Sequence, residues 1–400
     1  MRLKHSHDLI YPGAFFIASC AVEGMVIMNV VFTCGGTAGH VNPAIALAGL
    51  MKKKDPKTKI LFVGSEKGME RGLVEKAGYD FVGIEIQNFR RSMKPANIVH
   101  NLKTAKTLMI APGKAKKVIR NFSPDLVVGT GGYASYPMIK YASKAGIPTA
   151  VHESNMVPGL TTKMLEPYAE RVMVGFEACR QYYKNPDKVI VTGTPVRGDF
   201  FEMTKDKARR KLEIHDDKPV VVTFWGSLGA SNMNAMMEDF IKREIADEKF
   251  HHIYAVGGSG YAAMKEKLKA DKVDVAACPM EDMREYIYNM AEVMRAADIV
   301  ICRAGASTIS ELTALGVPAI IVPSPYVVNN HQEKNARVLE KAGGAVLLIE
   351  KETSGNELYD TALCILSDKP RLAKMGAAMA SLGIPDATER IYETVISIKK

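Results

Sequence analysis

Three glycine-rich segments have chemically useful neighbours in this 400-residue chain: Cys34–His40, Trp225–Ala230 and Arg303–Thr308. Each follows an apolar run that is typical of a buried strand, and each precedes a helical pattern. A strand, a tight glycine turn and a helix leave backbone N–H groups free to hold an anion such as a phosphate. Such a turn in each half of the chain predicts two Rossmann-like domains of the nucleotide-binding type that face each other.

Residues that could move a proton or bind a sugar follow the strands of the first half. His40 comes after the last glycine of its segment, and imidazole can act as a general base near neutral pH. The alternative is that His40 only orders its loop. Glu153 and Asn155 end another predicted strand, where a carboxylate could orient or deprotonate a hydroxyl and an amide could bind sugar hydroxyls. A purely structural loop is the alternative there.

Two segments are candidates for further phosphate contacts. Gly129–Ser135 follows a predicted strand and could hold a second phosphate-bearing group, or it could be a simple tight turn. In Arg303–Thr308, Gly305 forms the turn, and the next three residues offer N–H groups and hydroxyls to a diphosphate. Glu311, one helical turn later, could accept hydrogen bonds from both ribose hydroxyls. A capping box is the structural alternative for Glu311, but it explains neither the strand nor the glycine.

The net charge of +9 has a local excess. Asn88–Asn121 holds nine basic residues, with apolar residues between them and no acidic residue. Such a stretch favours contact with an anionic membrane surface. Nucleic acid is the alternative partner, and an ordinary amphipathic helix with a solvated basic face is the structural alternative. No run reaches the ~18–20 apolar residues that span a bilayer.

Composition and cysteine spacing narrow the class of protein. With 47% hydrophobic and 24% charged residues and no low-complexity tract, the chain is predicted to be globular. Its six cysteines have no spacing suited to a metal, which predicts free thiols in a reducing compartment. The first glycine segment lacks the G-x-G-x-x-G spacing of dinucleotide-binding enzymes, which disfavours an NAD(P)-dependent oxidoreductase.

Strand and helix patterns alternate along the chain, which predicts an α/β fold with parallel sheets. Short apolar runs are expected to be strands at 30–33, 60–63, 126–128, 149–151, 171–174, 189–191, 220–224, 253–256, 273–276, 299–302, 319–322 and 345–349. The pattern lapses into a charged helical segment at 203–214, so the junction between two domains lies between about Pro195 and Lys218.

Two Rossmann-like domains are therefore expected, the first at 29–197 and the second at 198–384. The amphipathic segment 385–400 is expected to pack back on the first domain, by analogy with other folds built from two facing Rossmann-like domains. Residues 1–28 contain a short apolar run after basic residues, but a strand pattern follows at once. They are interpreted as an extension or an upstream start rather than a cleaved signal.

Seven motifs occur in an order and spacing shared with one family, at 35–44, 131–133, 152–155, 193–197, 226–230, 302–311 and 384–390. Together they resemble the MurG family of glycosyltransferases. Four residues depart from the family's usual pattern, namely Ala38, Trp225, Leu228 and His331. The resemblance implies the GT-B fold, in which two facing Rossmann-like domains hold the active site between them.

The resemblance implies an inverting hexosyltransferase. GlcNAc would move from UDP-GlcNAc to the C4 hydroxyl of the muramic acid (MurNAc) in lipid I, which is undecaprenyl-pyrophosphoryl-MurNAc-pentapeptide, to form lipid II for peptidoglycan synthesis. No metal and no cofactor are expected, because helix N-termini would offset the diphosphate charge. Asn88–Asn121 would dock the first domain on the cytoplasmic face of the cell membrane. Other cell-wall enzymes are candidate partners, and nucleic acid is not.

The resemblance also implies roles for single residues. His40 is expected to be the base or an orienting group, and Glu153 is the second choice. The acceptor diphosphate would contact Gly131, Gly132 and Tyr133. UDP-GlcNAc would contact Thr37, Ala38, Gly39, Asn155, Arg197, Ser227, Ile287, Ala306, Ser307, Thr308, Glu311 and Gln332.

Other functions would share part of these features. Another GT-B enzyme that uses a UDP-sugar, such as a diacylglycerol glycosyltransferase or a UDP-GlcNAc 2-epimerase, would have a similar nucleotide half. An epimerase needs no membrane patch, whereas a glycolipid synthase would share it, so the acceptor is the discriminating feature. A non-catalytic membrane or nucleic-acid binder would explain Asn88–Asn121 but would leave the two nucleotide-type halves without a role.

Overall fold

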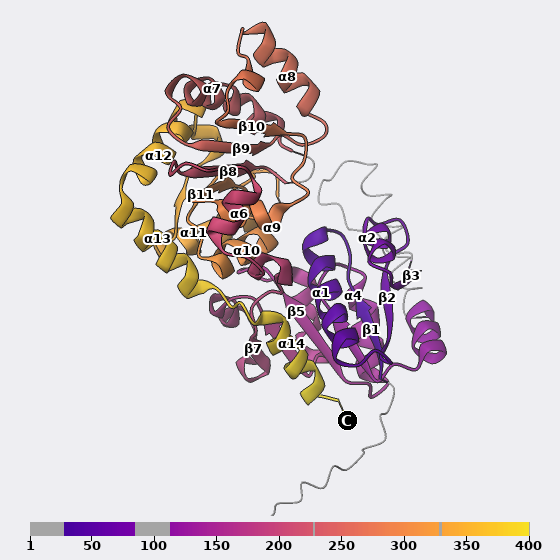
Figure 1. Ribbon diagram of the computed structural model, residues 1–400. Helices are drawn as coiled ribbons and strands as arrows, with labels where there is room; N and C mark the ends of the chain where they lie inside the picture. The colour runs from indigo at the N-terminus through magenta and orange to yellow at the C-terminus, as the bar shows by residue number, and fades with distance from the viewer. Residues whose placement is uncertain (1–27, 85–112, 227–228, 328–329, 400) are drawn as a thin grey trace, which may run out of the picture.

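The structure is a computed structural model that describes residues 28–84, 113–226, 229–327 and 330–399. It contains two units, which lie one above the other in Figure 1. Each unit is a parallel sheet with helices packed against it, so the prediction of an α/β fold with parallel sheets is confirmed.

The first unit has a seven-stranded sheet in the order β3-β2-β1-β4-β5-β6-β7. Its strands are β1 (Asn29–Thr33), β2 (Lys59–Ser65), β3 (Asp80–Ile84), β4 (Leu126–Gly129), β5 (Thr149–Glu153), β6 (Arg171–Val174) and β7 (Val189–Val191). Its helices are α1 (Ala38–Lys54), α2 (Glu70–Lys76), a helix at 113–122, α4 (Ser135–Lys144) and α5 (Leu160–Leu165), with 3₁₀ turns η1 (Glu166–Tyr168), η2 (Glu177–Tyr182) and η3 (Pro186–Lys188). The central strands β1, β4 and β5 are buried almost throughout because helices cover both faces of the sheet.

The second unit has a six-stranded sheet in the order β10-β9-β8-β11-β12-β13. Its strands are β8 (Val220–Phe224), β9 (His251–Ala255), β10 (Glu281–Arg284), β11 (Ile299–Cys302), β12 (Ala319–Ile321) and β13 (Ala345–Leu347). Its helices are α6 (Lys205–Lys211), α7 (Ser231–Asp247), α8 (Tyr261–Ala270), α9 (Met290–Ala296), α10 (Ala306–Leu315), α11 (His331–Lys341), α12 (Gly355–Ser367) and α13 (Lys369–Leu382), with 3₁₀ turns η4 (Gly198–Phe201), η5 (Val275–Ala277) and η7 (Glu350–Glu352).

Three expected details of the strands are wrong. The run 273–276, expected to be a strand, overlaps the 3₁₀ turn η5. Strands β3 and β10 were not expected from the sequence, and both lie at sheet edges. These two strands are half-exposed, and β10 is mostly polar, so the buried apolar run that marks a central strand is missing.

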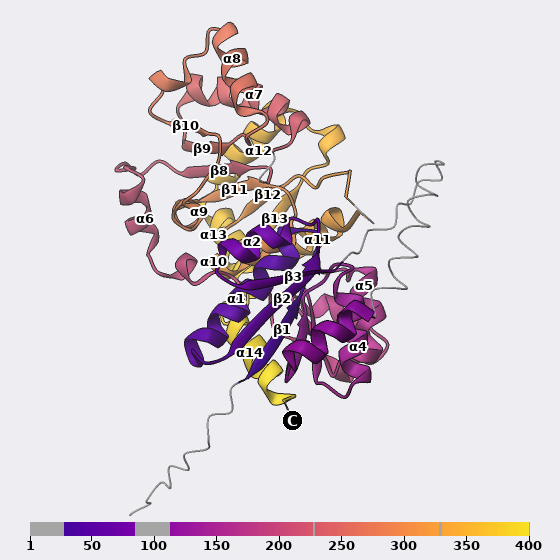
Figure 2. The same ribbon diagram turned by 90° about the vertical axis from the view of Figure 1, so that its right-hand side faces the viewer.

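The last helix, α14 (Ala387–Ser397), returns from the second unit to the first, as Figure 2 shows. It packs against α1 and β6. Ile391 and Val395 are buried in the same apolar cluster as Val30 and Phe32 of β1. The expected domain boundary after residue 197 falls at the start of η4, which contacts α9 and α10 of the second unit.

The helix at 113–122 is the described end of the basic segment Asn88–Asn121, and the rest of that segment lies outside the described residues. The helix is amphipathic. Its apolar side chains are buried in the core of the first unit, and several of its basic side chains are exposed: Ala115, Val118 and Ile119 against Lys116, Lys117 and Arg120. This part fits the alternative of an ordinary amphipathic helix. Among the described helices, none combines the length and apolarity needed to cross a membrane.

Candidate active site

The carboxyl ends of the two sheets face each other, and a glycine turn from each unit meets there. A Cβ atom on Gly39, in the first turn of α1, would lie 3.7 Å from Ser307 Oγ in the first turn of α10. Parallel strands present their loops at this edge, where ligands bind in open α/β sheets. The two glycine turns of the predicted site therefore lie close together.

A buried amide links the two units at a second point. Asn335 on α11 accepts a hydrogen bond from Met156 N at 3.2 Å through Oδ1, and its Nδ2 donates to Ala304 O at 3.2 Å. The amide thus ties the loop after β5 to the loop after β11. Sequence reasoning missed Asn335. The available signal was its position one helical turn after Gln332, on the same helix.

The imidazole of His40 is held in one orientation. Nδ1 is 2.8 Å from Gly35 O, and because a carbonyl oxygen can only accept, Nδ1 is assigned the proton and Nε2 keeps a free lone pair. Thr130 Oγ1 donates to His40 O at 2.6 Å. The ring packs on Gly131, where a Cβ atom would lie 2.7 Å from Cδ2. One basic nitrogen on a fixed ring is what a general base requires.

The predicted acceptor loop lies beside this imidazole. Gly131 and Gly132 both have positive φ, 107° and 81°, which a residue with a side chain rarely adopts. A Cβ atom on Gly132 would overlap Gly35 O, so the two glycine turns of the first unit pack backbone against backbone. Tyr133 follows and is exposed.

Glu153 is saturated with hydrogen bonds. Its Oε1 accepts from Asn155 N at 3.0 Å and from Asn155 Nδ2 at 2.9 Å. Its Oε2 accepts from Gly159 N at 2.8 Å and from Thr162 Oγ1. A buried carboxylate with four donors has little capacity left to take a proton from a substrate. The geometry therefore supports a structural role for Glu153 in the loop after β5, and not the role of second-choice base.

His152, next to Glu153, is also committed to the protein. The side chain is buried, and its Nε2 lies 2.9 Å from Gly193 O. Burial lowers the pKa of His152, so the ring is neutral at neutral pH. It ties β5 to the segment that leads to Arg197, whose exposed guanidinium pairs with Asp199 at 2.9 Å.

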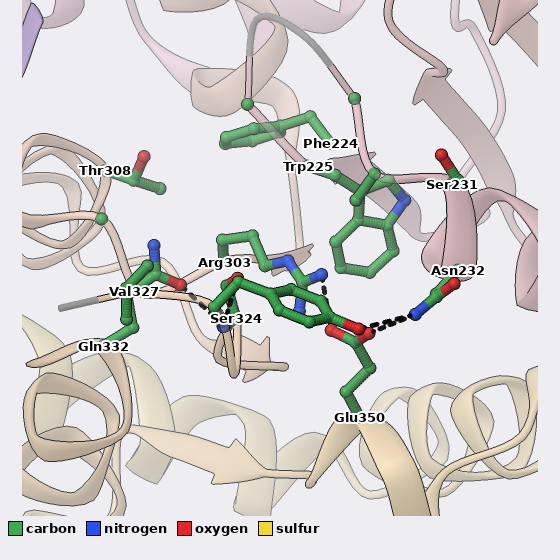
Figure 3. A pocket seen from close by; sticks show the side chains of 15 residues that line it. Phe224, Trp225, Ser231, Asn232, Arg303, Thr308, Ser324, Val327, Gln332 and Glu350 are labelled. Carbon is green, nitrogen blue, oxygen red and sulfur yellow. Dashed lines mark hydrogen bonds and ion pairs between the residues drawn. The ribbon is translucent and has the colours of Figure 1, made fainter. Parts of the chain in front are cut away.

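The second unit has a cavity of about 480 Å³ at the carboxyl ends of β8 and β11 (Figure 3). Its walls include the first turns of three helices, α7, α10 and α11. N–H groups in a first turn lack helical partners, and the helix dipole makes them favourable to an anion. Ser227 and Leu228, which stand between the cavity-lining residues Gly226 and Gly229 in the sequence, lie outside the described residues.

One wall of the cavity is a buried ion pair that sequence reasoning missed. Arg303 Nη2 lies 2.7 Å from Glu350 Oε2, and both side chains are buried or nearly so. Arg303 Nη1 donates to Val322 O, Asn232 Nδ2 donates to Glu350 Oε1 at 3.0 Å, and the guanidinium lies over the Trp225 ring (Figure 3). Glu350 thus neutralises the arginine, which leaves the helix N-termini as the main electropositive groups of the cavity.

Gln332 and Thr308 face one side of this cavity (Figure 3). Gln332 Oε1 accepts from Ser324 N at 2.9 Å, which leaves its NH₂ group to donate to a ligand. Ile287 follows β10 and is buried, and it is not among the residues that line this cavity. Burial raises the pKa of Glu311 to about 7; Arg197 opposes this shift and Asp199 adds to it.

No metal cluster is formed by the described residues: none of their groups of His, Cys, Asp or Glu could hold an ion through three or more ligands. The described cysteines are free thiols: Cys34, Cys179, Cys278, Cys302 and Cys364. Two facing parallel α/β units, with a cavity in one and an oriented imidazole in the other, have the architecture of the GT-B fold.

Comparison with known proteins identifies the family. The model of the glycosyltransferase family 28 N-terminal domain matches residues 30–174, and that of the family's C-terminal domain matches residues 220–391. A relative from Acetivibrio thermocellus is 43% identical over 93% of this chain and 99% of its own length. It is named UDP-N-acetylglucosamine--N-acetylmuramyl-(pentapeptide) pyrophosphoryl-undecaprenol N-acetylglucosamine transferase. A relative of the same name from Listeria monocytogenes is 38% identical over 93% of this chain and 100% of its own length.

Solved structures agree with this result. The crystal structure of Acinetobacter baumannii MurG has a TM-score of 0.71 and 25% identity, and the match covers 92% of this chain and 99% of that one. A UDP-GlcNAc 2-epimerase from Neisseria meningitidis, at 14% identity and a TM-score of 0.61 over 92% of this chain and 100% of that one, shares the fold alone. The chain belongs to glycosyltransferase family 28 and, within it, to the MurG family.

Proposed function

We propose that this protein transfers GlcNAc from UDP-GlcNAc to the C4 hydroxyl of the muramic acid in lipid I and so forms lipid II. The observation that carries the proposal is the approach of the Gly39 turn, which precedes the oriented imidazole of His40, to Ser307, whose neighbour Thr308 lines the cavity of the second unit. Family membership supports the same reaction, because relatives that match this chain over nearly their whole length are named for it.

The donor would bind mainly to the second unit. The diphosphate would lie at the first turn of α10, where N–H groups need partners and the dipole favours negative charge. Glu311 would accept hydrogen bonds from the ribose, the backbone of Ile287 would contact uracil, and the NH₂ group of Gln332 would donate to the sugar. The full set of proposed donor contacts is Thr37, Ala38, Gly39, Asn155, Arg197, Ser227, Ile287, Ala306, Ser307, Thr308, Glu311 and Gln332.

The acceptor would bind to the first unit. Gly131, Gly132 and Tyr133 would contact its diphosphate beside His40. The C4 hydroxyl oxygen attacks the anomeric carbon, the bond from that carbon to the phosphate oxygen breaks, and UDP leaves with the electron pair. The hydroxyl proton passes to His40 Nε2, the nitrogen with the free lone pair. Direct attack inverts the anomeric configuration.

The lipid acceptor places this reaction at a membrane. We propose that the protein acts as a peripheral protein at the cytoplasmic face, where Asn88–Asn121 would contact anionic lipids. The proposed domains are 29–197 for the acceptor and 198–384 for UDP-GlcNAc, with 385–400 returning to the first. Other cell-wall enzymes are candidate partners.

Transfer of labelled GlcNAc tests the proposal. Labelled UDP-GlcNAc is incubated with a soluble-tailed lipid I analogue and, in parallel, with diacylglycerol, in EDTA. We expect label on the lipid I analogue, none on diacylglycerol and no loss of rate in EDTA. Label on diacylglycerol instead would mean that the nucleotide half is assigned correctly and that the acceptor is wrong.

A further inference from the structure

A buried carboxylate under the first glycine turn has no part in the mechanism above. Glu70, the first residue of α2, has a side chain with no exposed surface. Its Oε1 accepts a hydrogen bond from Ser65 N at 2.7 Å. Its Oε2 is buried and finds no hydrogen-bond partner among the described residues. Burying a carboxylate that has no hydrogen bond to one of its two oxygens is unfavourable, so its presence here calls for an explanation.

Three glycines from separate turns and strands make room for this carboxylate. A Cβ atom on Gly35 would lie 2.9 Å from Glu70 Oε1, and one on Gly64 would lie 2.7 Å from Glu70 Cγ. A Cβ atom on Gly68 would overlap the carboxylate itself. None of the three has a positive φ, so the glycines are needed here for space and not for conformation. The chain forgoes three side chains to hold one carboxylate against the β1–α1 turn.

The Gly35 peptide connects Glu70 to the proposed base. Glu70 packs against Gly35 from one direction, and the Gly35 carbonyl accepts the hydrogen bond from His40 Nδ1 at 2.8 Å. Gly132 packs against that same carbonyl closely enough to exclude a side chain. The peptide is therefore confined, and a shift of the Glu70 carboxylate would shift the oxygen that orients the imidazole.

The charge of Glu70 also acts on His40 across the Gly35 peptide. When His40 Nε2 takes a proton, the ring becomes positive and its Nδ1–H bond to Gly35 O becomes charge-assisted. A buried carboxylate beyond that peptide favours the positive ring, and low dielectric strengthens the effect. Two other titratable groups near this turn are neutral at neutral pH. Burial, with the Glu70 charge second, raises the pKa of Cys34 to about 12, and burial lowers the pKa of His152.

We propose that Glu70 is a positioning residue for His40. It acts through the Gly35 peptide, which it holds in place to accept the hydrogen bond from Nδ1–H, and its charge favours the imidazolium that forms as the acceptor hydroxyl is deprotonated. The inference rests on the proposed function, because it takes His40 as the base of the transfer reaction.

A double-mutant cycle tests this role with the full chain. Glu70→Gln keeps the shape of the side chain and removes the charge. We expect it to lower kcat of GlcNAc transfer to the lipid I analogue about tenfold, with the KM for UDP-GlcNAc unchanged within about twofold. In a His40→Ala background the same substitution is expected to change kcat less than about twofold, because the group through which Glu70 acts is gone. Glu75→Gln is the matched control, since Glu75 is an exposed carboxylate on the same helix and pairs with Arg71.

The outcomes separate the inference from the function it rests on. No transfer by the wild-type protein would remove the proposed function itself. If the wild-type protein is active and Glu70→Gln lowers kcat tenfold both in the wild-type and in the His40→Ala background, the positioning role is overturned. A general loss of structure would act independently of His40 in this way. Equal rates for Glu70→Gln and Glu75→Gln would overturn it as well. If Glu70→Gln does not fold, Glu70→Asp enters the same cycle, with a loss of kcat that again depends on His40.

Discussion

The two facing sheet edges carry their polar groups in opposite states. In the first unit, Glu153 accepts four hydrogen bonds from its own loop, and His40 Nδ1 is taken up by Gly35 O. In the second unit, three helix N-termini and the NH₂ group of Gln332 surround a cavity of about 480 Å³. Two units of the same α/β architecture thus differ: the first fixes its side chains where we propose that a proton moves, and the second leaves hydrogen-bond donors open where a nucleotide sugar would bind.

The largest effect is expected from the first unit. His40→Ala removes the proposed base and should lower kcat by roughly 10²–10⁴ while the Kd for UDP-GlcNAc changes little. Steady-state transfer and calorimetric titration with UDP-GlcNAc measure the two quantities. A variant with near-normal kcat would mean that His40 only orders its loop.

The matching substitution in the second unit should act on binding. Glu311→Gln weakens the proposed ribose contact and should raise the KM for UDP-GlcNAc by roughly tenfold, with a small effect on kcat. Because the pKa of Glu311 is raised to about 7, the ionised acceptor forms as pH rises through that value. The KM of the wild type should therefore fall from acid to alkaline pH across this range, whereas Glu311→Gln should show no such change. An equal pH dependence in both proteins would exclude Glu311 from the donor site.

Substitution of Glu153 in the first unit and of Glu311 in the second unit should change the free energy of unfolding in opposite directions. Glu153→Ala leaves four donors without their acceptor and should lower the free energy of unfolding by about 2–4 kcal/mol. Glu311→Gln should instead raise stability at pH 8. A folded pKa above the ordinary value means that the wild type loses stability as pH rises from about 4.5 to 7. Denaturant unfolding at pH 8 compares the two variants, and similar losses in both would remove the contrast between the units.

The smallest expected effect lies in the core of the second unit, away from the site. Burial raises the pKa of Glu244 to about 8, and the nearby Glu281 adds to the shift. Its folded pKa exceeds the unfolded value, so the wild type loses stability as pH rises from about 4.5 to 8. Glu244→Gln keeps an acceptor for Phe250 N and should raise Tm by about 3 °C at pH 8.5, with little change at pH 5. A Tm difference independent of pH would contradict this account.

Much of the fold followed from local patterns. The runs at 171–174 and 299–302 match β6 and β11 residue for residue, because covered parallel strands are mostly apolar runs. The run at 189–191 matches β7, an edge strand whose three residues are all apolar. The edge strands β3 and β10 escaped because their residues alternate between the sheet and solvent or are mostly polar. Their pairing depends on the neighbouring strand, which no local window contains.

The sequence predicted where the residues of the candidate site lie better than it predicted what each of them does. Glycine turns and the polar residues after them placed His40, Glu153 and Glu311 at the facing sheet edges. The sequence could not show that donors from Asn155 to Thr162 would converge on Glu153, because that depends on the path of the loop after β5. Asn335 and Glu350 were missed for the same reason, since their partners lie far away in the chain.

Single-turnover transfer at saturating UDP-GlcNAc tests the division between the two units most directly. His40→Ala and Glu311→Gln are compared with the wild type, with the same lipid I analogue in each case. The account predicts that saturation restores the rate of Glu311→Gln to within about threefold of the wild type and leaves His40→Ala at least about a hundredfold slower. Recovery of His40→Ala at saturation, or a persistent large deficit in Glu311→Gln, would contradict it.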